Sequence, residues 1–223
     1  MNVPAADVEA IISAAGQGTR LGLGPKAFVL LAGRTLLEHA VATMLSVAAR
    51  VTVAVPSADL AHAEHLVGGP SVRVIAGGMR RVDTVRALVD SATLPWLLLQ
   101  DVVHPFVTKE LSQRVIEEAH RAGAAAAALS NVDFLYGKDG SLRAVPGDVV
   151  AIQKPVAFRR ADAARGFAVA DRNASWGLVP DMGSVTILAL AGQSVAFVSG
   201  EAINFKLTTS NDLELAQRLM AQD

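Results

Sequence analysis

The stretch IISAAGQGTRLGLGPK, residues 11–26, decides the fold of this 223-residue chain. It begins with small and β-branched apolar residues and continues into a segment with four glycines, one arginine and one lysine. A buried strand that opens into glycines and cations is typical of a phosphate-binding loop, because glycine exposes backbone N–H groups and the cations neutralise phosphate charge. The stretch therefore predicts a phosphate site at the end of a first strand.

Outward from this stretch, the sequence alternates between apolar strands and amphipathic helices. Strands are predicted at 8–14, 50–55, 72–76, 96–101 and 124–130, and helices at 33–46, 57–67, 80–92 and 108–122. Strands separated by helical crossovers indicate a mostly parallel sheet with helices on both faces. The predicted fold class is therefore a doubly wound, mostly parallel α/β sheet, in a single domain over residues 1–223.

The alternation ends after Ser130 with a more polar segment. Residues 131–146 read as two short strands around a Lys-Asp-Gly turn, which predicts a β-hairpin arm that projects from the sheet. The arm carries Phe134, Leu135 and Tyr136, which a lone hairpin cannot bury, so we expect a two-fold homodimer built on it. Beyond the arm, a helix is predicted at 159–170, strands at 184–190, 194–199 and 203–208, and a last helix opening at Thr209.

Composition excludes several classes of protein. A net charge of -1 argues against a nucleic-acid partner, which usually requires a basic face. The chain has no cysteine, so disulfides and thiol catalysis are excluded. No apolar run approaches the roughly 18 residues of a membrane helix, and the N-terminal residues lack a signal segment. We therefore expect no membrane partner and a cytoplasmic location.

The opening loop resembles a triphosphate site more closely than a dinucleotide site. Its first two glycines resemble a dinucleotide fingerprint, but Leu21 takes the place of the third glycine, and the second predicted strand ends at Val55 rather than near an acid. Arg20 and Lys26 instead favour a triphosphate whose charge is neutralised during attack. A nicotinamide-dependent oxidoreductase, and a tight turn with two solvated cations, remain as alternatives.

Five separate blocks carry a resemblance to a known family. They are AAGQGTRLGLGPK from 14, GRTLLEHAV from 33, AGGMRRVDTV from 76, LLLQDVVHPFV from 97 and GEAINFKLTTSNDLELA from 200. In this order the blocks resemble the 2-C-methyl-D-erythritol 4-phosphate cytidylyltransferases. The resemblance implies a Rossmann-like nucleotidyltransferase with an arm that interlocks two subunits. It also implies that CTP and a phosphorylated polyol react to give a CDP-alcohol and pyrophosphate.

The resemblance assigns roles to residues of the nucleotide half. Catalytic charge neutralisation falls to Arg20, Lys26 and Lys206, with Lys26 expected in a solvent-lined loop. Nucleotide binding falls to Ala14, Ala15, Gly16, Gln17, Gly18, Thr19, Gly78, Thr84 and Asp101. Asp101 ends a predicted strand, where ligands bind in open α/β sheets, so it is also the candidate ligand for the Mg²⁺ cofactor. The alternative, that Asp101 only caps the following turn, stays open.

The sequence departs from the family pattern in the half that binds the acceptor alcohol. The usual Asp-Ala-Ala-Arg-Pro carries His104 in place of arginine, and the usual Thr-Pro-Gln begins with Lys154, without the arginine expected about eight residues earlier. Asp133 is followed by Phe134 instead of threonine, and Asp181 lies between proline and methionine instead of in Thr-Asp-Asp or Thr-Asp-Glu. The acceptor-binding candidates are His104, Asp133, Lys154 and Asp181.

These departures leave three interpretations. The chain is a methylerythritol phosphate cytidylyltransferase in which Lys154 replaces a lost cation, a cytidylyltransferase for another acceptor such as ribitol 5-phosphate, or a nucleotide-binding homologue without turnover. Protonated His104 would hold an acceptor phosphate better than neutral His104, with a change expected near pH 6.5. Packing of His104 beside Pro105 at a turn is the alternative for that residue.

Overall fold

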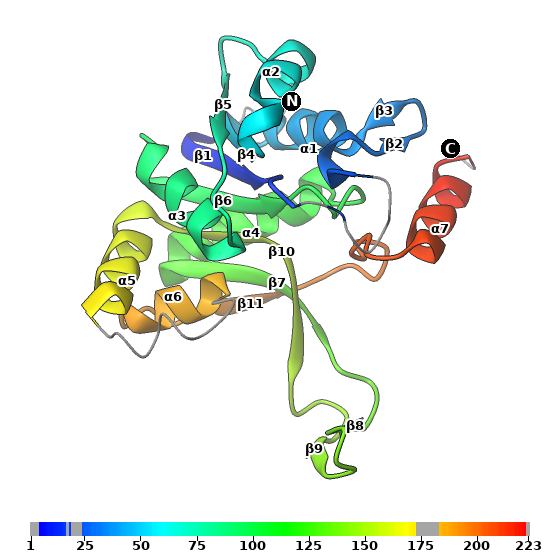
Figure 1. Cartoon of the computed structure of the whole chain (residues 1–223). Coiled ribbons are helices and arrows are strands. Elements are labelled where there is room, and N and C mark those ends of the chain that lie inside the picture. The colour runs from blue at the N-terminus through cyan, green and yellow to red at the C-terminus, as the bar shows by residue number, and fades with distance from the viewer. Residues whose placement is uncertain (1–4, 17, 19–23, 173–182, 222–223) are drawn as a thin grey trace.

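The computed structural model describes residues 5–16, 18, 24–172 and 183–221. A seven-stranded sheet lies at its centre, in the order β11-β7-β10-β6-β1-β4-β5 (Figure 1). Its strands are β1 (Ala5–Ser13), β4 (Ala48–Val55), β5 (Val72–Ala76), β6 (Trp96–Asp101), β7 (Ala124–Ser130), β10 (Val150–Arg159) and β11 (Ala196–Ser199). Only β10 runs antiparallel to its neighbours, β6 and β7. The predicted mostly parallel sheet is confirmed.

Helices cover both faces of the sheet, so the doubly wound arrangement is confirmed as well. On one face lie α1 (Leu36–Leu45), α2 (Leu60–Val67), α4 (Lys109–Ala122) and α7 (Ser210–Met220). On the other lie α3 (Arg81–Ser91), α5 (Arg160–Arg172) and α6 (Ser184–Leu190). The 3-10 turns η1 (Lys26–Phe28) and η2 (Ser57–Asp59) and a small hairpin of β2 (Leu30–Leu31) and β3 (Arg34–Thr35) complete the body.

Burial on both faces explains the continuous apolar runs of the central strands. In β6, Leu98 packs toward α1 and α4, whereas Leu97 and Leu99 pack toward α3 and α5. Successive side chains of a strand point to opposite faces, so a strand covered on both sides needs apolar residues at every position. The alanine run of β7 follows the same rule, because Ala124 to Ala128 are all buried.

The predicted strand at 184–190 is wrong, because these residues form α6. Val185, Thr186 and Ile187 are β-branched and favour a strand locally. However, Ser184, Ile187 and Leu188 are the buried positions, which is helical spacing. A Cβ added to Gly166 of α5 would lie 2.0 Å from the Ile187 carbonyl oxygen, so the glycine lets the two helices pack closely. Tertiary packing thus overrides the local preference.

The segment at 203–208 and the strand that lies beside β6 also differ from the prediction. The predicted strand at 203–208 is wrong, because this segment pairs with no strand of the sheet, although Leu207 N donates to the Val103 carbonyl at 2.8 Å. The place beside β6 is taken by β10, which we did not predict. Pro155 lies within β10 and has no N–H for a ladder, and the register with β7 shifts between Ile152 and Val156. The irregular ladder accommodates the proline.

The arm projects beyond the ends of β7 and β10, as predicted (Figure 1). It contains the short strands β8 (Leu135–Tyr136) and β9 (Leu142–Ala144). The Asn131 side chain closes its base by donating to the Val145 carbonyl at 3.1 Å and accepting from Val149 N at 3.2 Å. The Phe134 and Tyr136 side chains remain 59% and 64% exposed, so the arm leaves apolar surface uncovered in a single chain.

Candidate active site

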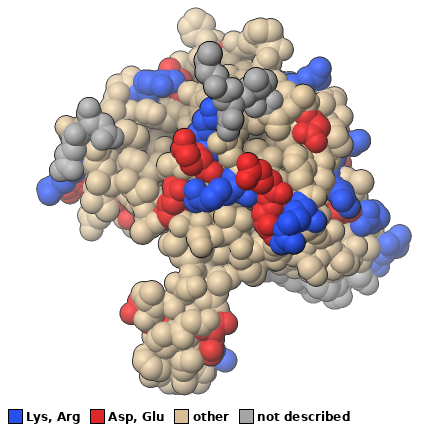
Figure 2. Space-filling model, turned by 180° about the vertical axis from the view of Figure 1, so that it is seen from behind, with Lys and Arg blue, Asp and Glu red and all other residues tan. Residues whose placement is uncertain are grey.

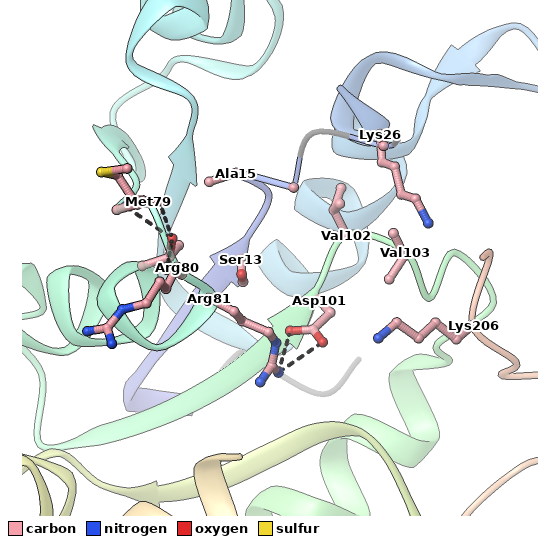
Figure 3. Close-up of a pocket in the computed structure, with 14 residues that line it drawn as sticks. Ser13, Ala15, Lys26, Met79, Arg80, Arg81, Asp101, Val102, Val103 and Lys206 are labelled. Atoms are coloured by element: carbon pink, nitrogen blue, oxygen red, sulfur yellow. Dashed lines mark hydrogen bonds and ion pairs between the residues drawn. The ribbon is translucent and has the colours of Figure 1, made fainter. Parts of the chain in front are cut away.

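Two adjoining cavities lie at the carboxyl ends of β1 and β6. The first, of about 290 Å³, is lined by the glycine loop, by Gly78 to Arg81 and by Thr84 (Figure 3). The second, of about 580 Å³, is lined by His104, by Ile152 to Lys154, and by the start of α6. Arg81, Asp101 and Lys206 line both cavities, so these three residues mark the junction between them.

Glycine is required in the opening loop because the backbone returns on itself. Gly18 has a φ of +67°, and a Cβ at this position would lie 2.0 Å from the Gly24 carbonyl oxygen. Lys26 N donates to the Gly16 carbonyl at 3.3 Å and closes the loop. Gly16, Gly18 and Ala15, which were predicted to bind the nucleotide, line the first cavity, whereas Ala14 is buried and donates its N–H to the Ala54 carbonyl.

Lys26 is more enclosed than we expected. Its side chain is buried rather than solvent-lined, and Nζ donates to the Leu207 carbonyl at 2.9 Å. This bond ties the opening loop to the segment that carries Lys206, 181 residues further along the chain. Lys206 itself is exposed and extends toward Asp101 (Figure 3). The two lysines therefore reach the site from opposite ends of the chain.

The loop before α3 forms the opposite wall of the first cavity. Thr84 Oγ1 accepts a hydrogen bond from Gly78 N at 3.1 Å and lies 3.2 Å from the Arg80 carbonyl oxygen, to which it donates. A Cβ on Gly77 would lie 2.4 Å from Ala15 Cβ, so the two glycine loops touch. The Thr84 hydroxyl, predicted to bind the nucleotide, is thus already engaged in shaping the loop.

Asp101 lies at the end of β6, and Arg81 donates to it. Arg81 Nη2 is 3.1 Å and 3.3 Å from the two carboxylate oxygens (Figure 3). Burial acts to raise the pKa of the Asp101 carboxyl, but the charges of Lys154 and Arg81 outweigh burial and hold that pKa below its usual range. Asp101 is therefore ionised at neutral pH. The sequence prediction did not include Arg81, although its position after a glycine pair repeats the pattern of the opening loop.

His104 lines the second cavity and is neutral at pH 7. Its Nδ1 donates to the Asn204 carbonyl at 3.2 Å, because a carbonyl oxygen only accepts. Burial lowers the pKa of His104 below its ordinary value, and nearby Asp101 offsets this only in part. The titration that we expected near pH 6.5 therefore lies lower.

The lowered pKa of His104 predicts a pH-dependent stability. The unfolded chain binds a proton at His104 at a higher pH than the folded chain does. The free energy of unfolding should therefore fall as pH drops below about 6.5, by at most about 1.4 kcal/mol per pH unit. Chemical denaturation from pH 7.5 to 5 should show a shallower fall for His104→Asn than for the parent. His65→Asn, which removes an exposed histidine of α2, is the matched control; equal slopes in parent and His104→Asn would contradict the assignment.

Lys154 is buried in the second cavity beside α6. Its Nζ lies 3.5 Å from Ser184 Oγ, and its carbonyl accepts a 2.6 Å hydrogen bond from Asn204 Nδ2. Gln153 Nε2 donates to the Asn204 carbonyl at 3.2 Å. Gln153 and Asn204 therefore fasten β10 to the segment that carries Lys206. Neither amide was predicted, because only the approach of two distant segments gives them a role.

The remaining predicted residues lie elsewhere. Asp133 is exposed on the arm and lines neither cavity of its own chain. Gln17, Thr19, Arg20 and Asp181 lie outside the described residues.

The described part of both cavities carries a large excess of positive charge. Lys26, Arg80, Arg81, Lys154 and Lys206 line them, against Asp101 as the one described carboxylate. Within the described ranges, no group of three or more His, Asp or Glu side chains is arranged to hold a metal ion. The arrangement suits two phosphorylated ligands that meet at the junction, because the cations neutralise charge on both. No helix of the described ranges is long and apolar enough to cross a membrane.

Comparisons with known proteins agree with this geometry. The family model for 2-C-methyl-D-erythritol 4-phosphate cytidylyltransferase matches residues 8–222. The enzyme of that name from Thermus thermophilus is 40% identical over 216 residues, which cover 96% of this chain and 97% of the relative. The one from Deinococcus radiodurans is 37% identical, with 94% and 88% covered. A crystal structure of the enzyme from Thermus thermophilus superimposes with a TM-score of 0.80 at 35% identity and covers 99% of this chain and 100% of that one.

Proposed function

The chain belongs to the 2-C-methyl-D-erythritol 4-phosphate cytidylyltransferase family, and we propose that it performs the reaction for which its relatives are named. In that reaction CTP and 2-C-methyl-D-erythritol 4-phosphate give a CDP-alcohol and pyrophosphate, a step toward isoprenoid precursors. One observation carries the proposal for this chain. Lys26, Asp101 and Lys206, which are far apart in sequence, meet around two joined cavities that are rich in positive charge.

The proposed mechanism uses charge and alignment. An oxygen of the acceptor phosphate attacks the α-phosphorus of CTP, a new P–O bond forms, and the bond to the β-phosphate oxygen breaks, leaving pyrophosphate with the electron pair. The nucleotide occupies the first cavity and the acceptor phosphate enters from the second. Lys206, exposed at the junction, neutralises charge on the two phosphates that react. Lys26 and, from its place in the motif, Arg20 neutralise the triphosphate.

Magnesium fits this site only as an ion that also binds the substrate phosphates. Asp101 is ionised, which is the form that a hard cation binds, and it would supply one protein ligand. When bound, the ion would neutralise charge that develops on the leaving pyrophosphate. The remaining ligands would come from phosphate oxygens and water, because Mg²⁺ dehydrates reluctantly.

The cytoplasmic location remains a prediction from the sequence.

A panel of acceptors tests the proposal and its alternatives. We expect pyrophosphate release from CTP and Mg²⁺ to require a phosphorylated polyol and to be fastest with 2-C-methyl-D-erythritol 4-phosphate. Ribitol 5-phosphate is the second candidate, because the acceptor cavity departs from the family pattern and has neutral His104 where the family has an arginine. Faster turnover with ribitol 5-phosphate would select that alternative. Failure of every acceptor, with CTP still raising the melting temperature, would leave a nucleotide-binding homologue.

We also propose that two chains pair through the arm. Figure 2 shows the arm as a separate projection, with uncharged surface between acidic side chains at its edges. Five of its apolar side chains are more than two-fifths exposed, namely Val132, Phe134, Leu135, Tyr136 and Leu142. A second copy of the chain would cover these side chains. Asp133, which lines neither cavity of its own chain, would then face a site of the partner chain.

The arm predicts the oligomeric state. The parent should be a dimer in light scattering after gel filtration, and Phe134→Ser with Tyr136→Ser should shift it toward the monomer, because both changes remove apolar surface that only a partner covers. Changing exposed Lys138 of the same arm to serine is the control that leaves the apolar surface intact. A monomeric parent would refute the proposed pairing.

A further inference from the structure

We infer that Arg81 binds the phosphate of the acceptor at the junction of the two cavities, with Asp101 aiming its guanidinium; this rests on the proposed function. Arg81 is the first residue of α3 and lines both cavities. Its side chain is 29% exposed, so it reaches the cavities without being a free surface group.

The basic side chains of the second cavity differ in kind. Among the described residues that line the second cavity, Arg81 is the one arginine. His104, which replaces the arginine of the family pattern, is buried and neutral, and Lys154 offers a point charge. A guanidinium presents several donors in one plane and suits a phosphate better than an ammonium does. Arg81 therefore supplies the permanent, forked charge that positions 104 and 154 lack.

Several positive side chains lie near Asp101. The positive charges of Lys154, Arg81 and Lys206 all act to keep the pKa of Asp101 low. Among the described residues, Lys154 and Lys206 therefore lie near enough to act on the same carboxylate as Arg81. The N-terminus of α3 adds its own partial positive charge beside Arg81. An anion at the junction would be attracted by all of these positive groups.

The Asp101 carboxylate sets the direction of the Arg81 side chain. Both carboxylate oxygens of Asp101 accept from Arg81 Nη2, at 3.1 Å and 3.3 Å, and the guanidinium is thereby held across the end of β6 (Figure 3). Arg80, the preceding residue, instead bonds to Asp83 of its own helix at 2.7 Å. Two adjacent arginines thus have different functions: Arg80 caps α3, and Arg81 faces the junction.

The test is a comparison of Michaelis constants in Arg81→Gln and Arg81→Lys. Loss of one charge-assisted phosphate contact should raise the KM for 2-C-methyl-D-erythritol 4-phosphate by about 10- to 100-fold in Arg81→Gln. The KM for CTP should change by less than about threefold, and Arg81→Lys should recover part of the loss. Inhibition by inorganic phosphate, competitive with the acceptor, should weaken in the same proportion. Arg86→Gln, which breaks another arginine–aspartate pair of α3 outside both cavities, is the matched control and should leave both constants unchanged.

The Asp101→Asn variant separates phosphate binding by Arg81 from a structural role of Arg81. If Arg81 only neutralises Asp101, Arg81→Gln should not change the affinity for inorganic phosphate, measured by calorimetry, once Asp101→Asn is present. If Arg81 binds the phosphate, that affinity should still fall by about 10-fold or more in the Asp101→Asn background. An unchanged phosphate affinity there, or equal effects on the KM values of CTP and acceptor in Arg81→Gln, would overturn the inference. An inactive parent would instead defeat the proposed function, so the two failures are distinguishable. Circular dichroism of each variant checks that α3 is folded.

Discussion

Lys206→Ala is expected to lower kcat by about 100- to 1000-fold, the usual effect of removing one preorganised donor from a transition state. Lys206 is the one described lysine that lines both cavities, and its side chain is exposed. The melting temperature should therefore remain within about 1 °C of the parent, since an exposed lysine contributes little to folding. Steady-state kinetics of pyrophosphate release, with a thermal melt of the same sample, measures both.

Two control variants accompany Lys206→Ala. Lys109→Ala removes a partly exposed lysine at the start of α4, outside both cavities, and should leave kcat unchanged. Lys206→Arg keeps the charge and should retain more activity than alanine does. Full turnover in Lys206→Ala would remove this lysine from the mechanism.

Lys26→Met should lower both turnover and stability. A loss of about 100-fold or more in kcat is expected from the missing charge at the triphosphate. In addition, the Leu207 carbonyl loses the 2.9 Å hydrogen bond from Nζ, and an unsatisfied buried acceptor costs about 1–3 kcal/mol. Urea denaturation should therefore show a lower free energy of unfolding, whereas Lys206→Ala should not. If Lys26→Met melts like the parent, the tie between the opening loop and the C-terminal segment is absent in solution.

Much of the fold could be predicted because it depends on local pattern. The strand at residues 8–14 and the helices after it follow from periodicity and from the glycine loop. The miss at β10 has a physical cause, because Gln153, Lys154 and Pro155 interrupt the apolar run with groups that strands in a sheet centre usually avoid. Likewise, α6 is helical because α5 offers it a close surface at Gly166, which no local preference reveals.

Some features of the candidate site could also be predicted from the sequence, and others could not. Lys26, Asp101 and Lys206 were predicted from blocks of sequence that resemble the family, and the structure places all three around the joined cavities. The burial of Lys26 and the lowered pKa of His104 were not predicted, because both depend on the segment at 203–208, which approaches from the far end of the chain. A side chain's protonation and exposure are properties of its neighbours rather than of its own motif.

The central claim is that an oxygen of the acceptor phosphate attacks the α-phosphorus of CTP. The most direct test uses 2-C-methyl-D-erythritol 4-phosphate whose non-bridging phosphate oxygens are labelled with ¹⁸O, together with unlabelled CTP and Mg²⁺. Mass spectrometry of the products should find all of the label in the CDP-alcohol, including the oxygen that joins the two phosphorus atoms, and none in pyrophosphate. Label in pyrophosphate, or CTP consumed without a CDP-alcohol, would contradict the account.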